Sequence, residues 1–343
     1  MRSMEYRQLG TTGIRASALC VGVAFRGRQR RGLTDEHCMT TIERAVDLGI
    51  NFLDCANVYG RGWSEELLGR TVKRLGGRDR LVITTKVGQA MGDAPSERGL
   101  SREYILEQID RSLHRLQMDY VDIYLMHQPD ATVPLEESLR AMDDVVRQGK
   151  ARHVGVSNHH AAEVVEMLWT AEREGLAAPA MLQYQYSLLH RWHTEYDLAP
   201  LCVRHGLGLM TYSPLAIGLL TGQVRRGRPL PAESHWRDSA DTSRVLDYAE
   251  PAIAALVDVA GELGKTPAQV AIAWLLANPA LSAPILGPDL PEHVDEAVGA
   301  VGWRLPPEQK ARLDEASADG GPFVMNAASL RPLPHRGPAS GPR

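Results

Sequence analysis

The stretch Leu81-Val-Ile-Thr-Thr-Lys86 is followed by a helical pattern from Ser101 to about Leu116 and then by Val121-Asp-Ile-Tyr-Leu-Met126. Both stretches are short and mainly apolar or β-branched, which is typical of strands that are covered on both faces. A strand, a helix and a second strand in this order predict two parallel strands, because the helix returns the chain to the same end of the sheet.

The same alternation extends along the chain in both directions. Further strands are predicted at 19–25, 50–54, 151–156, 181–184, 207–212 and 283–286. Helices are predicted at 35–48, 64–75, 135–147, 161–174, 195–204, 251–263, 267–276 and 291–301. Ser64 is the predicted cap of the helix at 64–75, and Pro200 is an irregularity in the helix at 195–204. Eight strand–helix units in 343 residues predict an α/β protein with a closed (β/α)8 TIM barrel.

Three segments lie outside this alternation. Residues 5–19 carry two short strand patterns around a glycine turn, which predicts an N-terminal β-hairpin. The polar segment Gln223–Asp247 predicts a long loop after the seventh strand. We interpret residues 1–319 as a single barrel domain and residues 320–343 as a Pro/Gly-rich tail that is poorly ordered at its end.

Composition excludes several classes of protein. Apolar residues make up 44% of the chain and charged residues 23%, and the net charge of -4 provides no basic field for nucleic acid or an anionic membrane. There is no long apolar run and no apolar segment near Met1 that resembles a secretory signal. The four cysteines form no C-x-x-C pair and no zinc-finger spacing with histidines, so we expect reduced thiols, no metal site and a cytoplasmic location.

Polar residues follow three consecutive predicted strands. Asp54 ends the second strand and Tyr59 lies in the loop after it, Lys86 ends the third strand, and His127 follows the fourth. Each residue alone has an ordinary structural explanation, such as a turn cap or a surface charge. Because the carboxyl ends of barrel strands meet at one mouth, we expect the four side chains to converge there.

Together these side chains suit the reduction of a carbonyl group. Tyr59 can donate a proton to the developing alkoxide, but a tyrosine ordinarily ionises only near about pH 10. A Lys86 cation beside it would stabilise the phenolate, Asp54 would keep that lysine charged and oriented, and His127 could hydrogen-bond the substrate oxygen. The hydride must come from a cofactor, because no side chain can donate one.

These residues lie in motifs that resemble the aldo-keto reductase family. The motifs are Asn51-Phe-Leu-Asp-Cys-Ala-Asn-Val-Tyr-Gly-Arg-Gly-Trp-Ser-Glu-Glu-Leu-Leu-Gly69, Val82-Ile-Thr-Thr-Lys-Val87, Asp119-Tyr-Val-Asp-Ile-Tyr-Leu-Met-His127 and Gly149-Lys-Ala-Arg-His-Val-Gly-Val-Ser-Asn158. The resemblance covers about Glu5 to Asp314 and is greatest to the bacterial and potassium-channel β-subunit branches. It implies an NAD(P)H-dependent oxidoreductase that interconverts a carbonyl and an alcohol, with Asp54, Tyr59, Lys86 and His127 as catalytic residues.

The resemblance also implies a cofactor site. Ser157, Asn158 and Gln183 are expected at the nicotinamide carboxamide, with Tyr212 stacked on the ring and Val23 and Ala24 nearby. The loop Ser213-Pro214-Leu215-Ala216-Ile217-Gly218 is expected to offer backbone amides to the pyrophosphate. The adenosine half is expected near Gly287, Asp289, His293 and Glu296.

Asp289 departs from the family pattern. Family members commonly have a small hydroxyl or a basic residue there, which meets the adenosine 2′-phosphate. A carboxylate repels that phosphate and can accept a hydrogen bond from a free ribose hydroxyl, so it favours NAD(H). The family mostly uses NADP(H), and Arg225, Arg226, Arg228 or Arg237 in the long loop could provide a phosphate partner. The balance slightly favours NADP(H) over NAD(H).

Substrate and partners are less defined by the sequence. Arg26, Trp63 and Gln128 are expected to line a substrate pocket, with Arg61, His159 and Trp192 as further candidates near the mouth. This set suits sugars, aromatic aldehydes or a carboxylated ketone, and a homo-oligomer is possible. A Rossmann dehydrogenase is disfavoured because no G-x-G-x-x-G follows an N-terminal strand. A channel β-subunit-like cofactor-binding protein and a redox-neutral lyase or isomerase remain alternatives.

Overall fold

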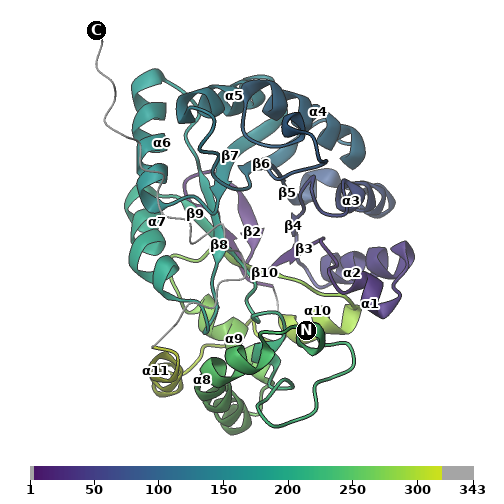
Figure 1. Cartoon of the computed structure of the whole chain (residues 1–343), viewed down its shortest axis with the longest axis vertical. Helices are drawn as coiled ribbons and strands as arrows, with labels where there is room; N and C mark the ends of the chain where they lie inside the picture. The colour runs from purple at the N-terminus through teal and green to yellow at the C-terminus, as the bar shows by residue number, and fades with distance from the viewer. Residues whose placement is uncertain (1–3, 319–343) are drawn as a thin grey trace.

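The computed structural model describes residues 4–318, and eight parallel strands close into a barrel within this range. Each strand pairs with the next one along the chain, and the last strand pairs with the first (Figure 1). The barrel strands are β3 (Cys20–Gly22), β4 (Phe52–Asp54), β5 (Val82–Val87), β6 (Val121–Met126), β7 (Ala151–Ser157), β8 (Met181–Gln185), β9 (Gly208–Tyr212) and β10 (Ala283–Leu286). The predicted TIM barrel is confirmed.

Helices surround the barrel (Figure 1). They are α1 (Arg28–Arg31), α2 (Asp35–Asp47), α3 (Trp63–Leu75), α4 (Arg102–Leu116), α5 (Leu135–Arg147), α6 (Ala161–Glu174), α7 (Ala199–His205), α8 (Thr242–Leu263), α9 (Pro267–Leu276), α10 (Pro291–Val298) and α11 (Pro307–Ala316). Short 3-10 turns and one π-helical segment, η3 (His193–Leu198), connect some of them. No helix within residues 4–318 is long and apolar enough to span a bilayer.

The helices follow from local sequence signals. In α4 the hydroxyl of Ser101 accepts a hydrogen bond from the amide of Tyr104 and so caps the helix, and the chain leaves the helix at Gln117 with a φ of 55°. In α5 two glutamates occupy the first turn, where negative charge favours the positive end of the helix dipole. Its apolar side chains recur at helical spacing and are buried toward the strands.

The N-terminal hairpin closes the end of the barrel at which the strands begin. The predicted N-terminal hairpin is present as β1 (Tyr6–Gln8) and β2 (Arg15–Ser17), paired antiparallel. Leu9 in its turn is fully buried and belongs to the apolar cluster inside the barrel, together with Phe52 and Ile123. A ligand therefore has to enter from the opposite end, where the strands finish.

Some helix boundaries differ from the sequence predictions. The helix predicted at 251–263 begins instead at Thr242, so the end of the predicted loop is helical and Pro251 lies inside α8. Burial of Val245, Leu246 and Ala249 along its first turns offsets the hydrogen bond that the proline cannot make.

The helix predicted at 195–204 is a π-helical segment joined to α7, with Pro200 in the first turn, where its missing amide costs little. The helix predicted from Ser64 starts one residue earlier, after Gly62, and the last predicted helix ends at Val298. The sequence did not predict α1 and α11. The predicted C-terminal tail lies outside the described residues.

Candidate active site

A buried ion pair stands at the open end of the barrel. Asp54 ends β4, and Lys86 stands near the end of the neighbouring strand β5. The lysine Nζ donates to Asp54 Oδ2 and to the carbonyl oxygen of Cys55, each at 2.7 Å, and the lysine is fully buried. Burial is the largest single influence and lowers the pKa of Lys86. The charge and hydrogen bond of Asp54, together with Tyr59, outweigh burial and raise that pKa, so the lysine stays protonated.

Two further donors hold the other oxygen of Asp54. Thr84 Oγ1 donates to Oδ1 at 2.5 Å, and Gln183 Nε2 donates to the same oxygen at 2.9 Å. Thr84 and Lys86 are two residues apart on β5, so both point to the interior of the barrel. Thr84 was not predicted as a site residue, although this spacing is a signal that could have identified it.

Tyr59 and His127 face each other above this pair. Their rings lie edge to face with centroids 5.7 Å apart, and Lys86 Nζ is 5.0 Å from the centroid of the Tyr59 ring. Burial, followed by the charges of Lys86 and Arg26, holds the pKa of His127 well below its ordinary value. The imidazole is therefore neutral, and its buried Nδ1 has no partner among the described residues. The structure brings the four predicted catalytic residues together.

The expected nicotinamide residues form one connected group. Asn158 has a φ of 61°, and its Nδ2 donates to Ser157 Oγ at 2.9 Å and to the carbonyl oxygen of His127 at 3.0 Å. The hydroxyl of Tyr212 donates to Asn158 Oδ1 at 2.8 Å. Val23 is tied to the catalytic strand, because its amide donates to the carbonyl oxygen of Asp54 at 2.8 Å. Ala24 follows it and is half-buried.

The loop after β9 is a series of tight turns. Ser213, Ala216 and Ile217 all have positive φ angles, and Gly218 continues the turn with a φ of 85°. The amides of Ala216 and Gly218 donate within the loop to the carbonyl oxygens of Ser213 and Leu215. Pro214 has no amide hydrogen, so within the described chain the loop amides without a backbone partner are those of Ser213, Leu215 and Ile217. This reduces the set of expected amide donors.

The residues present fit a nicotinamide dinucleotide. Two glycines, Gly218 after β9 and Gly287 after β10, have no neighbouring atom within 4 Å of the position where a Cβ would be, so both border open space. Barrels commonly bind phosphate groups between the loops after their seventh and eighth strands, and β9 and β10 hold these places here. The Asn158 group adjoins the start of the loop after β9, because Tyr212 at the end of β9 donates to Asn158.

Asp289 has close partners that the sequence did not predict. Its Oδ1 accepts from the amide of Gly27 at 3.2 Å, and its Oδ2 pairs with Arg31 Nε at 3.3 Å. His293 Nδ1 accepts a hydrogen bond from the Asp289 amide at 3.3 Å. The last expected adenosine residue, Glu296, is half-buried on the same helix, α10.

Two arginines of the long loop pair with other carboxylates. Arg225 pairs with Glu250, and Arg226 pairs with Asp247 at 3.2 Å, and both carboxylates belong to α8. The arginine that contacts Asp289 comes instead from α1, directly after the first barrel strand. The run of four arginines between residues 26 and 31 was the signal in the sequence for this contact.

The expected substrate residues are not equally placed. Arg26 is exposed, and its charge acts on both His127 and Tyr212, which places it at the mouth. Gln128 is half-buried and directly follows the catalytic histidine. The indole of Trp63 donates to Asp35 Oδ1 at 3.0 Å and lies under the guanidinium of Arg28, so contacts with α1 and α2 hold it.

The three further candidates are either exposed or almost fully buried, unlike residues that line a pocket. Arg61 is exposed, with a φ of 54°, and His159 is 2% exposed. Trp192 is 62% exposed and packs against Tyr196 with ring centroids 5.9 Å apart.

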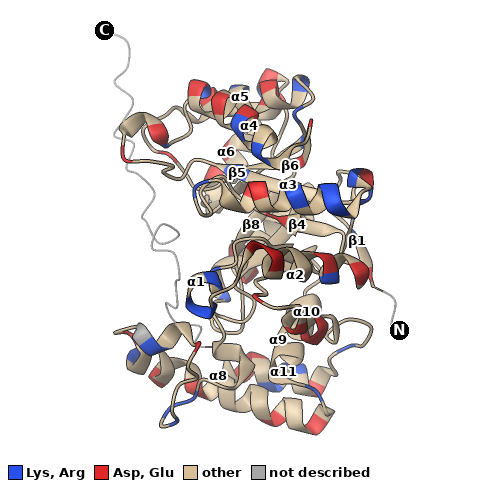
Figure 2. Ribbon diagram, turned by 90° about the vertical axis from the view of Figure 1, so that its right-hand side faces the viewer, with Lys and Arg blue, Asp and Glu red and all other residues tan. Residues whose placement is uncertain are grey.

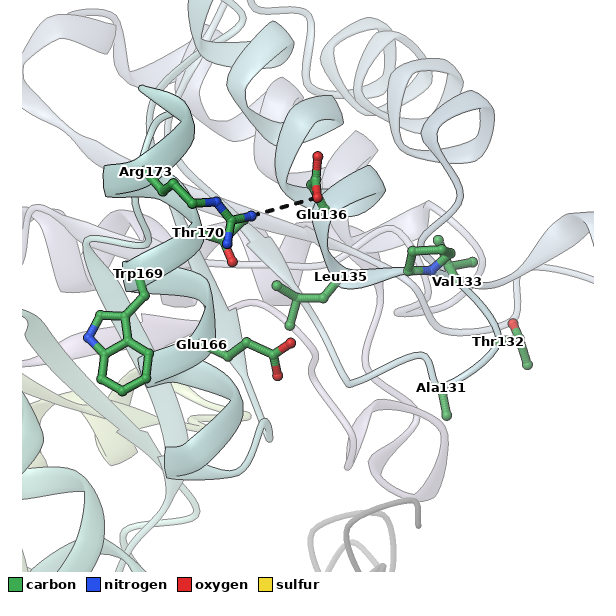
Figure 3. A pocket seen from close by; sticks show the side chains of 10 residues that line it. Ala131, Thr132, Val133, Leu135, Glu136, Glu166, Trp169, Thr170 and Arg173 are labelled. Atoms are coloured by element: carbon green, nitrogen blue, oxygen red, sulfur yellow. Dashed lines mark ion pairs between the residues drawn. The ribbon is translucent and has the colours of Figure 1, made fainter. Parts of the chain in front are cut away.

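A separate groove of about 540 Å³ lies on the outside of the barrel (Figure 3). The segment 131–136 and the residues Glu166, Trp169, Thr170 and Arg173 of α6 line it. It includes none of the predicted site residues. Within residues 4–318 no three His, Cys, Asp or Glu side chains are arranged to hold a metal ion, and the four cysteines are free and buried.

His159 makes the stability of the fold depend on pH. Its Nδ1 lies 3.0 Å from the carbonyl oxygen of Ser157, and burial lowers its pKa from 6.5 to about 4. The unfolded chain therefore binds this proton first as the pH falls, and the stability that the neutral ring provides above pH 6.5 is lost down to about pH 4.

We expect His159→Gln to lose less stability than the wild type over this interval, by up to about 1.4 kcal/mol per pH unit. Urea unfolding at several pH values measures the difference in slope. Equal slopes for both proteins would contradict a buried neutral histidine.

Comparison with known proteins agrees with this geometry. Residues 18–318 match the family model described as the aldo/keto reductase family. The chain belongs to the aldo/keto reductase family. Members of this family are generally NAD(P)H-dependent oxidoreductases.

Two relatives carry the name "Probable voltage-gated potassium channel subunit beta". The one from Arabidopsis thaliana is 38% identical over 306 residues, which cover 87% of this chain and 91% of the relative. The one from Oryza sativa subsp. japonica has the same identity and the same coverage. The predicted resemblance of this aldo/keto reductase to the channel β-subunit branch is confirmed.

Proposed function

We propose that this aldo/keto reductase transfers hydride reversibly between a nicotinamide cofactor and a carbonyl substrate, which is an aldehyde, a ketone or a sugar. The observation that carries the proposal is the buried Asp54–Lys86 pair next to the Tyr59 ring, with neutral His127 opposite. A structural ion pair needs neither a tyrosine beside its cation nor a buried imidazole with an unpartnered nitrogen against that tyrosine.

Each side chain has a defined task. Tyr59 donates a proton to the carbonyl oxygen during reduction and accepts it during alcohol oxidation. The Lys86 cation stabilises the phenolate, and Asp54 holds the lysine in place. Neutral His127 can orient the substrate oxygen through a hydrogen bond without competing as an acid, because its pKa is lowered. When bound, the nicotinamide supplies the hydride.

The cofactor contacts support the same proposal. Asn158, Ser157 and Gln183 would bind the carboxamide, and Tyr212 would stack on the nicotinamide ring. The loop after β9 would bind the pyrophosphate through the amides of Ser213, Leu215 and Ile217. The adenosine half would extend toward Gly287 and Asp289, with NADP(H) slightly favoured over NAD(H).

The first test combines binding and turnover. Purified protein is titrated with NADPH and NADH while the quenching of tryptophan fluorescence is followed, and is then given aldehydes, ketones and aldoses while reduced nicotinamide is monitored by absorbance. We expect saturable binding of at least one dinucleotide and its carbonyl-dependent oxidation. Binding of neither dinucleotide would refute the proposal, as would conversion of a substrate without any change in the nicotinamide.

A second function has specific support from the names of the relatives. A protein similar to a potassium-channel β-subunit could bind the cofactor with little turnover and act through a partner protein. The same experiment separates the two. Tight dinucleotide binding with no oxidation by any carbonyl would favour the binding role over the enzyme.

A further inference from the structure

We infer that Arg31, on the short arginine-rich helix α1, binds the ribose phosphate that distinguishes NADP(H) from NAD(H), and that Asp289 holds this arginine ready. The inference rests on the proposed function and specifies which cofactor the same site prefers. It reverses the simplest interpretation of Asp289, in which a carboxylate at this position repels that phosphate.

The position of α1 is the first support. Gly287 borders open space after β10, and Asp289 follows it at the place where barrels commonly bind phosphate groups. The contact with Asp289 brings α1 to the same place. In Figure 2 the ribbon of α1 is largely blue, the colour of Lys and Arg.

The state of Asp289 is the second support. One carboxylate oxygen accepts from the Gly27 amide and the other pairs with Arg31, so both oxygens are engaged. Any side chain on Gly27 would collide with this carboxylate, so the approach needs a glycine there. The Arg31 guanidinium therefore compensates the negative charge of this carboxylate, which weakens its repulsion of a phosphate.

The balance of charge on α1 is the third support. Arg28 shares Asp35 with Arg70, and Arg30 has no carboxylate partner among the described residues. Asp289 is the only acidic partner of Arg31 in the described chain, and it contacts Nε. Arg31 is 26% exposed, so its terminal nitrogens can reach an anion in the mouth. Arg30 and Arg31 carry two positive charges against the single Asp289 carboxylate, so one net positive charge remains, which suits a dianionic phosphate monoester.

The test measures binding, with no need for turnover. The full chain, wild type and Arg31→Gln, is titrated by tryptophan fluorescence with NADPH, NADH, 2′,5′-ADP and 5′-ADP. We expect the variant to bind NADPH and 2′,5′-ADP about tenfold to a hundredfold more weakly, with binding of NADH and 5′-ADP almost unchanged. Of these ligands, 2′,5′-ADP carries the ribose 2′-phosphate and 5′-ADP does not. Comparing the two therefore distinguishes binding of the 2′-phosphate from binding of a phosphate elsewhere in the site.

Arg44→Gln is the matched control, because Arg44 also pairs with an aspartate, Asp295 of α10, through an exposed contact at 2.5 Å. This variant should bind all four ligands as the wild type does. Asp289→Asn should bind NADPH more tightly, because the asparagine oxygen can still accept from Arg31 while the negative charge beside the phosphate is removed.

Two results would overturn this inference and leave the proposed function intact. One is an equal loss of NADPH and NADH affinity in Arg31→Gln, and the other is a loss of NADH affinity in Asp289→Asn with NADPH binding unchanged. A wild type that binds neither dinucleotide would refute the proposed function as well.

Discussion

Replacing Tyr59 by phenylalanine should reduce kcat on the order of 10²–10⁴-fold while leaving the affinity for the reduced cofactor unchanged. The variant keeps the ring that packs edge to face on His127 and lies near Lys86, and it removes only the hydroxyl. The proton donor is needed mainly in the transition state, so binding of the ground state should not change. Steady-state kinetics with the best carbonyl and fluorescence titration with the cofactor measure the two effects.

Tyr212→Phe is a suitable control for this experiment. It also removes one tyrosine hydroxyl at the mouth, but that hydroxyl donates to Asn158 at 2.8 Å and lies in the expected cofactor half. We expect this control to alter cofactor affinity more than kcat. A Tyr59→Phe protein with normal kcat, or one that loses turnover and cofactor binding equally, would show that Tyr59 is not the proton donor.

Replacing Lys86 by methionine should affect both activity and stability. The change leaves the Asp54 carboxylate buried without its cation, and we expect the free energy of unfolding to fall by about 3–5 kcal/mol. Thr84 and Gln183 still donate to that carboxylate, which favours the lower part of this interval. We expect turnover to fall by at least about 10²-fold, because the phenolate of Tyr59 loses its neighbouring charge.

The double variant Asp54→Asn/Lys86→Met separates the two effects. Without the buried carboxylate no uncompensated charge remains, so we expect much of the stability to return while activity stays low. Urea unfolding and steady-state kinetics on the same samples provide the comparison. Full activity in either variant would show that the Asp54–Lys86 pair only stabilises the fold.

The sequence alone predicted the barrel architecture and grouped the four candidate catalytic residues, which the structure places together. Strands and helices differ in the spacing of their apolar residues, so the alternation of the two patterns along the chain predicts eight parallel strands. Barrel geometry then brings strand ends together, which is why Asp54, Lys86 and His127 could be grouped before any coordinates were known. Local signals were weaker for α8, where Pro251 suggested a helix start and burial of earlier apolar residues extended the helix.

The tertiary structure alone decided which side chains meet across the mouth. Arg31 follows the first barrel strand and Asp289 follows the last, so their contact depends on the closure of β10 onto β3. It depends equally on the missing side chain of Gly27, which lets the carboxylate reach the backbone. A local sequence pattern shows residue types and the spacing of apolar residues. It does not show which charges surround a carboxylate, because closure of the barrel brings those groups near it.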